Sequence, residues 1–138
     1  MFNKILVPVD GSEYAFKALE YATMLAKRFS SEIYIVHVVQ TVAAIAYGTE
    51  MTGSSLIIDL KNHLEENGRR ILYAAESITK NAGVKAATAL VYGSPAEEII
   101  KFAEEKRADV VVIGGRGLGS VARFFLGSVS DKVCHYAP

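Results

Sequence analysis

The sequence has few residues that would cross-link a small fold or direct it to a charged partner. It contains 1 cysteine and no tryptophan in 138 residues, so no disulfide can form within the chain. Its 15 basic residues balance 15 acidic ones, which predicts neither nucleic acid nor an anionic membrane as a partner. No apolar run is long enough to span a bilayer, and the run that follows Lys4 is too short for a signal-peptide core. We therefore expect a cytoplasmic protein.

What the chain does contain is a series of short, strongly apolar runs. They are rich in β-branched residues and occupy residues 5–9, 33–39, 86–92 and 110–113, the third being the weakest. Near-continuous apolar runs of this length are typical of strands covered on both faces, as in a parallel sheet. The length suits one domain over residues 1–138, with 51% hydrophobic residues to build its core.

The segments between these runs have the apolar spacing of helices. One stripe covers residues 15–26 after Ser12, a second covers 57–78 and closes near Gly83, and a last helix is expected over 128–135. Another helix begins at Ser94, where Ser94-Pro95-Ala96-Glu97 predicts a capping box. Alternating strands and helices predict an α/β fold, an open and mostly parallel sheet with helices on both faces.

Residues 40–55 form the one long irregular stretch. The stretch follows the second predicted strand and mixes alanine, glycine and hydroxyl residues. Two interpretations stay open, a lid over a ligand site or a surface connection without a function.

The ends of the first and fourth predicted strands carry the chemistry. Ligands of open α/β sheets bind beyond the carboxyl ends of the strands. Here the first strand leads into Asp10, and the fourth leads into the glycine-rich run 114–120. Glycines let backbone N–H groups approach an anion, and Gly127 with Ser128 opens the last helix, whose free N–H groups favour phosphate. The pair of elements predicts a phosphate cradle.

Other glycine motifs do not fit. The chain has no G-x-x-x-x-G-K-[ST] sequence, so it is not a P-loop protein. The run from Gly115 places Ser120 where a dinucleotide-binding motif has its last glycine, and it follows the fourth strand rather than the first. Asp10 has a simpler interpretation as a helix cap, and Arg116 could contact phosphate or only solvent.

A family resemblance rests on these residues. Gly114-x-x-Gly117, nine further residues and Gly127-Ser128 resemble the ATP-binding signature of the universal stress protein family, as does the opening Val-Pro-Val-Asp-Gly-Ser at 7–12. The resemblance covers essentially the whole chain. It implies a Rossmann-like, adenine nucleotide α-hydrolase-like fold with strand order 3-2-1-4-5. Family members usually continue beyond the position of Pro138 into a final strand often used for dimerisation. The resemblance therefore implies a homodimer, and we expect the fifth strand to be absent from this chain, either because the printed sequence lacks the tail or because the protein lacks the strand. The geometry of the dimer stays open.

The resemblance also implies the ligand contacts. The ligand would be ATP, ADP or AMP, and Mg²⁺ or Mn²⁺ could accompany it beside Asp10. Adenosine would lie against the end of the first strand and the backbone of the second, and the phosphates against the glycine-rich segments. The implied residues are Pro8, Val9 and Asp10 around adenosine, Val38 at the adenine edge, Gly114, Gly115, Arg116, Gly117, Leu118, Gly119 and Ser120 around ribose and phosphates, and Gly127, Ser128, Val129 and Ser130 at the phosphate tail.

The sequence contains this binding motif without an evident catalytic set. We interpret the chain as an ATP-binding universal stress protein, a nucleotide-dependent regulatory module of the stress response that acts on an unidentified protein partner. A slow ATP hydrolase, with Asp10 as the one plausible acidic participant, and a dimeric scaffold that uses nucleotide structurally both stay open. The three histidines and Cys134 lack the spacing of metal ligands, and His37 is predicted to be a core residue with a satisfied ring.

Overall fold

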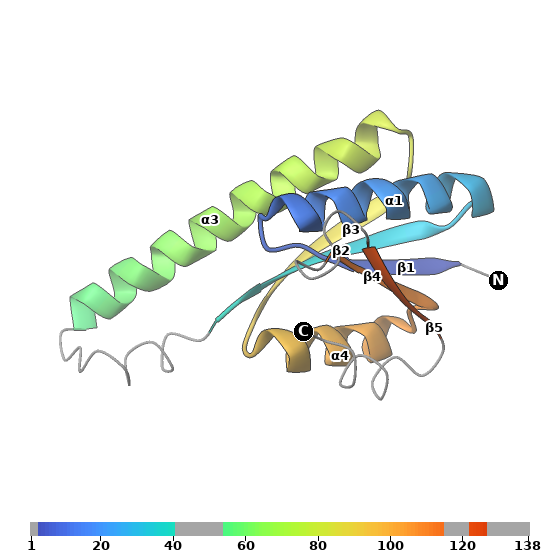
Figure 1. Cartoon of the computed structure of the whole chain (residues 1–138). Helices are drawn as coiled ribbons and strands as arrows, with labels where there is room; N and C mark the ends of the chain where they lie inside the picture. The colour runs from blue at the N-terminus through green and yellow to red at the C-terminus, as the bar shows by residue number, and fades with distance from the viewer. Residues whose placement is uncertain (1–2, 41–53, 115–121, 127–138) are drawn as a thin grey trace.

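A computed structural model describes residues 3–40, 54–114 and 122–126 of the chain, and its elements alternate as the sequence predicts. Figure 1 shows α1 and α3 on one face of a sheet and α4 on the other. The fold is therefore the predicted α/β fold with helices on both faces. The elements are β1 (Lys4–Pro8), α1 (Glu13–Phe29), β2 (Glu32–Val39), α3 (Ser54–Asn81), β3 (Ala86–Tyr92), α4 (Pro95–Lys106), β4 (Val110–Gly114) and β5 (Ala122–Leu126).

The sheet has the order β3-β2-β1-β4-β5. Strands β1 to β4 are parallel, with Pro8 opposite Val36 and Ile5 opposite Val110. The predicted order of the four parallel strands is confirmed. The chain winds outward from β1 to β3 and then returns to the other side of β1, so the carboxyl ends of β1 and β4 meet at the point where the winding reverses.

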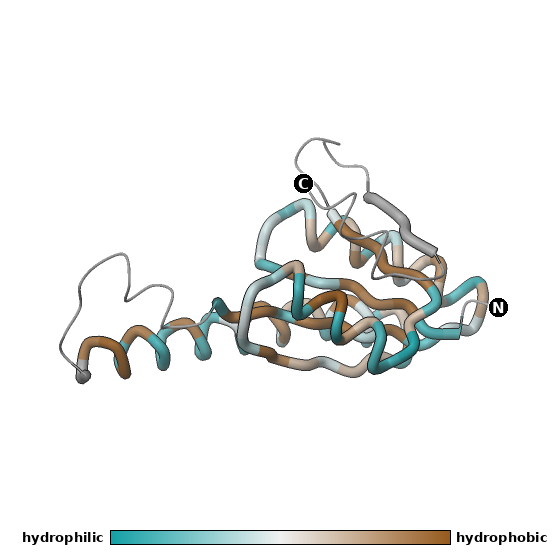
Figure 2. Tube along the Cα trace, turned by 90° about the horizontal axis from the view of Figure 1, so that it is seen from below, coloured by the Kyte–Doolittle hydropathy of each residue, from teal (hydrophilic) through white to brown (hydrophobic). Residues whose placement is uncertain are grey.

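The core explains why β1, β2 and β4 read as continuous apolar runs. Alternate side chains of β1 point to opposite faces of the sheet, so Ile5 packs under α1 and α3 while Leu6 packs with the residues of the α4 layer. Both are fully buried, as are Val36 and Val111. Figure 2 shows this apolar character along the central strands. Burial on both faces removes the need for polar residues at every second position.

The weakest predicted strand lies at an edge. Strand β3 pairs only with β2 among the described residues, and several of its side chains are half-buried or exposed. An edge strand with one covered face needs fewer large apolar residues. Its position in the sheet therefore accounts for its weak signal in the sequence.

The turn from β1 into α1 is held by side-chain caps. Ser12 is the N-cap residue, and its Oγ accepts the N–H of Ala15 at 3.1 Å. One carboxylate oxygen of Asp10 accepts the N–H of Ser12 at 2.9 Å. Ser30 ends the helix in a left-handed conformation with φ 56°. The start of this helix directly after Ser12 is as predicted, and the helix continues three residues beyond the apolar stripe that ends at Ala26.

The capping box predicted at the start of α4 is wrong. Ser94 is the N-cap and Pro95 opens the helix, but the Ser94 side chain accepts no backbone N–H. The Ser94 carbonyl instead accepts the N–H of Glu98 at 2.9 Å. The side chain of Glu98, not Glu97, lies over the turn, because a Cβ added to Gly93 would stand 2.7 Å from its carboxylate oxygen.

The sheet contains a fifth strand, β5, at residues 122–126, which is not the final strand that family members have beyond the position of Pro138. Strand β5 runs antiparallel to β4, with Val110 opposite Leu126 and Gly114 opposite Ala122. The sequence analysis does not predict a strand here. The segment contains two phenylalanines, which favour strands, and it pairs with the edge of β4 that the parallel strands leave open.

Two sequence predictions lie outside the described residues. The first is the helix at 128–135, and the second is most of the irregular stretch 40–55. Of that stretch, the structure describes Gln40, which follows β2, and the start of α3 at Ser54. In the ranges that the structure describes, no helix combines the length and apolar character required to cross a membrane.

Helix α3 is fastened to the end of β3 by a small polar cluster. Its N-terminal half reaches beyond the sheet (Figure 1). Lys61 lies 6.0 Å from the centre of the Tyr92 ring and 3.9 Å from the carboxylate of Glu65. The pKa of Glu65 lies below its ordinary value of 4.5. The largest cause is the hydrogen bond with the Tyr92 hydroxyl, and the positive charges of Lys61 and Arg69 contribute less. The same hydrogen bond raises the pKa of Tyr92.

This cluster predicts a stability difference that depends on pH. A lowered folded-state pKa of Glu65 contributes stability that is present above 4.5 and lost as the pH falls through the folded value. Urea unfolding should therefore show that Tyr92→Phe, which keeps the ring near Lys61, destabilises the protein at pH 7 and does so less below pH 4.5. Tyr73→Phe is the control. Tyr73 lies on α3, the helix that carries Glu65, and it is 75% exposed. A Tyr92→Phe effect that stays constant with pH would contradict the assignment.

Candidate functional site

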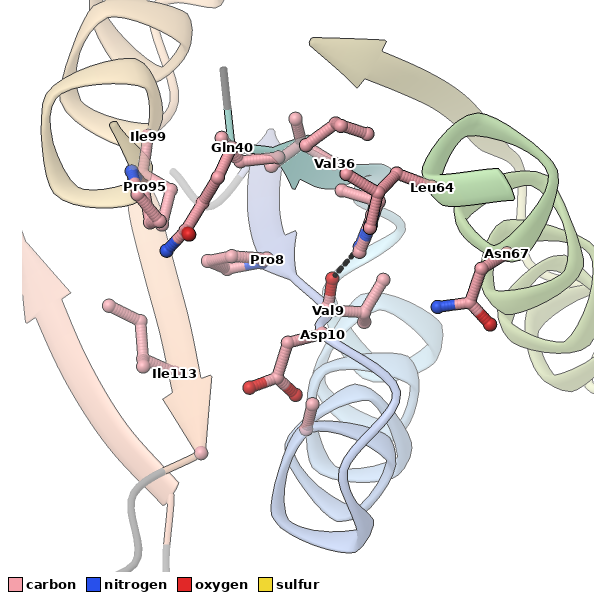
Figure 3. Close-up of a pocket in the computed structure, with 15 residues that line it drawn as sticks. Pro8, Val9, Asp10, Val36, Gln40, Leu64, Asn67, Pro95, Ile99 and Ile113 are labelled. Carbon is pink, nitrogen blue, oxygen red and sulfur yellow. Dashed lines mark hydrogen bonds between the residues drawn. The ribbon is translucent and has the colours of Figure 1, made fainter. Parts of the chain in front are cut away.

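A cavity of about 450 Å³ opens at the carboxyl edge of the sheet, a size that suits a small-molecule ligand. It lies where the ends of β1, β2 and β4 meet, between the first turn of α4 and the middle of α3 (Figure 3). This is the edge at which the sequence predicts a ligand. The lining residues are Pro8, Val9, Asp10, Ala15, Val36, His37, Val38, Val39, Gln40, Leu64, Asn67, Pro95, Ile99, Ile113 and Gly114.

One part of the cavity is an apolar slot. Pro8 and Ile113 come from the tips of β1 and β4, and Pro95 with Ile99 comes from the start of α4. Figure 3 shows these four side chains facing a common space. Flat, apolar surfaces of this kind can bury an aromatic ring at low cost, because they offer dispersion contacts and hold no unpaired polar groups.

Asp10 brings negative charge to the other part. Figure 3 shows its side chain between Ile113 and Asn67, with the carboxylate directed into the open space. One of its oxygens accepts the N–H of Ser12, and no residue in the described part of the chain bonds the other, which can accept from a ligand. Asp10 is not the helix cap of the simpler interpretation, because Ser12 is the N-cap residue of α1. Its carboxylate holds the turn before the helix and also lines the cavity.

Gly114 ends β4 in direct contact with the first turn of α1. A Cβ at this position would overlap the backbone carbonyl of Tyr14 and stand 2.9 Å from the N of Ala15. Only glycine permits this approach. The contact brings the tip of β4 to the cavity wall that Asp10 and Ala15 form, and the chain enters the glycine-rich run 115–120 from there.

The backbone of Val38 faces the cavity. Backbone groups of successive strand residues point to opposite neighbours, and the carbonyl of Val39 points toward β3, where it accepts the N–H of Gly93 at 2.9 Å. The carbonyl of Val36 points toward β1 and accepts the N–H of Val9 at 2.8 Å. Val38 shares the direction of Val36, so its N–H and C=O project past the end of β1.

Helix starts add positive potential around this edge. The first turns of α1 and α4 both contribute lining residues, Ala15 and Pro95. The start of a helix carries about half a positive charge, which favours an anion nearby, although the Ala15 N–H is already bonded to Ser12 Oγ and Pro95 has no N–H. Among the described lining residues, Asp10 and His37 are the ones that can ionise. The site therefore combines one carboxylate with dipoles that attract phosphate.

The structure brings five predicted residues together in this cavity: Pro8, Val9, Asp10, Val38 and Gly114. They line one cavity at the ends of β1, β2 and β4, and their role in binding a ligand stays a prediction. The other predicted residues lie outside the described part of the chain: Gly115, Arg116, Gly117, Leu118, Gly119, Ser120, Gly127, Ser128, Val129 and Ser130.

The sequence analysis missed several lining residues. Gln40 and Asn67 add amide groups from opposite sides of the cavity, and Leu64 and Ile99 add apolar contacts (Figure 3). Gln40 directly follows a strand, so its position at a strand end was a usable signal. Asn67 stands among charged and polar neighbours on α3, and nothing in that local pattern distinguishes it.

Metal ligands are not grouped in the described ranges. Within residues 3–40, 54–114 and 122–126, no cluster of histidine, cysteine, aspartate and glutamate has the arrangement of a metal site. His37 is 9% exposed, and its Nδ1 lies 2.8 Å from the carbonyl oxygen of Val9, which confirms a core histidine with a satisfied ring. His63 is exposed on α3.

The fold and the cavity define a class of protein. A mostly parallel sheet covered by helices on both faces, with a cavity at the carboxyl ends where the winding reverses, is the arrangement of Rossmann-like small-molecule-binding domains. Comparison with known proteins gives the particular family. Residues 1–138 match the Universal stress protein family, and the chain belongs to it.

Individual relatives agree with this assignment. The chain is 38% identical over 138 residues to the universal stress protein YxiE of Bacillus subtilis, a match that covers 96% of this chain and 92% of YxiE. A crystal structure from the same family in Burkholderia pseudomallei is similar with a TM-score of 0.72 and 28% identity, covering 99% of this chain and 90% of that one. A universal stress protein crystallised in complex with cAMP shares the fold, with a TM-score of 0.60 and 22% identity over 87% of this chain and 78% of its own.

Proposed function

We propose that this chain binds ATP in the cavity at the ends of β1, β2 and β4 and acts as a nucleotide-dependent regulatory module. The observation that carries the proposal is the set of groups facing one cavity: the apolar slot, the backbone edge of Val38, the carboxylate of Asp10 and the strand tip at Gly114. Each group suits a different part of one nucleotide.

The fit can be followed from base to phosphate. The base enters the slot near Pro8, Pro95 and Ile99, with its polar edge toward the Val38 backbone. The free oxygen of Asp10 then accepts from the ribose hydroxyls, because a carboxylate is an acceptor only. Beyond Gly114 the phosphates meet the glycine-rich run and the segment from Gly127, whose spacing supports a phosphate cradle.

A regulatory role fits the described cavity better than catalysis. Hydrolysis needs a residue that orients water and a metal held at the γ-phosphate. Asp10 is the one acidic side chain among the described lining residues, and it lies near the place proposed for the ribose. We accordingly propose a cytoplasmic switch that acts through a protein partner and forms a homodimer, with Mg²⁺ or Mn²⁺ accompanying the nucleotide.

The test is equilibrium binding of ATP to the purified protein by calorimetry. Wild-type protein should bind, and Gly117→Val and Gly127→Val should each weaken binding at least tenfold, about 1.4 kcal/mol. Gly83→Ala is the control for a side chain added away from the cavity, because Gly83 lies in the turn after α3 with no heavy atom within 4 Å of an added Cβ. Its left-handed φ of +74° makes the variant somewhat less stable but should leave ATP binding unchanged. Wild-type affinity in both cradle variants would reject the site.

Thermal unfolding gives an independent check. A ligand that binds only the folded state stabilises it, by about 2.7 kcal/mol at 100 times its Kd. ATP should therefore raise the Tm of the wild type and leave that of Gly127→Val nearly unchanged. Turnover of ATP, measured in the same samples, should stay at the level of the buffer; sustained release of phosphate would favour the slow hydrolase instead.

A further inference from the structure

The parallel ladder between β1 and β2 stops at an unusual bond. The N–H of Val9 donates to the carbonyl of Val36 at 2.8 Å, as the register requires. The next rung of a parallel ladder would join the N–H of Val38 to the carbonyl of Val9. In the described part of the chain this rung is not made, and the Val9 carbonyl pairs with Nδ1 of His37 at 2.8 Å (dashed line in Figure 3).

The bond settles which nitrogen of His37 carries a proton. A carbonyl oxygen only accepts hydrogen bonds, so Nδ1 must be the donor. The His37 side chain therefore takes the acceptor that the backbone of its own neighbour would otherwise use. The N–H and C=O of Val38 are left facing the cavity.

Tight packing holds the ring in this place. His37 is buried, and a Cβ added to Gly68 of α3 would stand 2.7 Å from its Cδ2 and 2.6 Å from Cδ1 of Leu90. Gly68 thus gives the ring the space it occupies between β2 and α3. The ring therefore packs closely against the backbone of Gly68 while its Nδ1 bonds the Val9 carbonyl.

We propose that His37 is a positioning residue for base recognition. By bonding the Val9 carbonyl, its ring keeps the Val38 N–H and C=O open as a donor–acceptor pair. Adenine offers the complementary pair, since its N1 accepts and its exocyclic amino group donates, whereas hypoxanthine presents a donor at N1 and an acceptor at O6. The inference rests on the proposed function and adds to it a reason for adenine selectivity.

The test uses two variants of nearly the same shape. His37→Leu removes the donor, and His37→Asn keeps an N–H near the position of Nδ1. Without the donor, the Val9 carbonyl is free to accept the Val38 N–H and extend the ladder. Hydrogen exchange of the Val38 amide in ligand-free protein, followed by NMR, should then slow about tenfold in His37→Leu and stay near the wild-type rate in His37→Asn.

Nucleotide preference supplies the second measurement. The preference of the wild type for ATP over ITP should fall about tenfold in His37→Leu and be retained in His37→Asn. Gly68→Ala, which keeps the histidine but crowds its ring, should shift both measurements in the direction of His37→Leu. A purely structural role of His37 would change stability without changing base preference.

The outcomes separate the two proposals. Equal Val38 exchange in the wild type and in His37→Leu, or an ATP preference that survives the loss of the donor, overturns the inference while leaving ATP binding intact. A wild type that binds no ATP rejects the proposed function and the role in base recognition together, whatever the exchange rates.

Discussion

Gly114→Ala is expected to lower the free energy of unfolding by about 3 kcal/mol or more. The added Cβ would overlap the carbonyl of Tyr14 and crowd the N of Ala15. Both are backbone atoms in the first turn of α1, which cannot move aside as a side-chain end can. The tip of β4 and the start of the helix must separate, so we also expect ATP binding to be lost. Urea unfolding monitored by circular dichroism measures the first effect.

Gly83→Ala is the control for this prediction. Gly83 has φ +74° and no heavy atom within 4 Å of an added Cβ. Alanine there carries only the cost of a left-handed backbone, about 1 kcal/mol. If Gly114→Ala lowers the free energy of unfolding no more than Gly83→Ala does, β4 and α1 can separate at little cost. The close contact at Gly114 would then contribute little to stability.

The fold follows from the sequence wherever burial leaves a pattern. The runs that became β1, β2 and β4 are recognisable because both of their faces are covered. Strand β5 escaped prediction because it is short, antiparallel and surrounded by glycine-rich sequence, so its apolar residues suggest packing as readily as pairing. Pairing is decided by the open edge of β4, which local sequence does not reveal.

The candidate site was predictable at the strand ends and not on the helices. Asp10 and Gly114 directly follow apolar runs, and the carboxyl ends of parallel strands meet at one edge. Val38, inside the second run, was expected at the site only from the family resemblance. Asn67 and Ile99 reach the cavity only because α3 and α4 pack at particular angles across the sheet. Helix periodicity gives the face that a residue occupies, but it does not give the position of that face over a cavity.

The role of His37 shows a second limit. Its place in an apolar strand predicts a buried ring with a partner, and the structure agrees. The partner, the Val9 carbonyl, lies 28 residues away along the chain. It comes within reach only because Pro8 pairs with Val36 in the β1–β2 register. The sequence predicts that the His37 ring has a hydrogen-bond partner. The register of β1 against β2 determines that this partner is the Val9 carbonyl, which would otherwise accept a backbone N–H of β2.

Asp10→Asn is expected to weaken ATP binding about tenfold to a hundredfold, because a hydrogen bond to a charged group contributes about 1.5–3 kcal/mol. Asparagine keeps an oxygen for the N–H of Ser12, so the turn into α1 and the stability should be retained. Asp10→Ala removes that acceptor as well and should additionally destabilise the protein, which separates binding from folding. Calorimetry with ATP and adenosine, each with Mg²⁺ and with EDTA, distinguishes the two ways in which the carboxylate could act. If Asp10 accepts from the ribose, Asp10→Asn weakens both ligands equally with and without the metal; a loss confined to ATP with Mg²⁺ would instead assign the carboxylate to a bound cation.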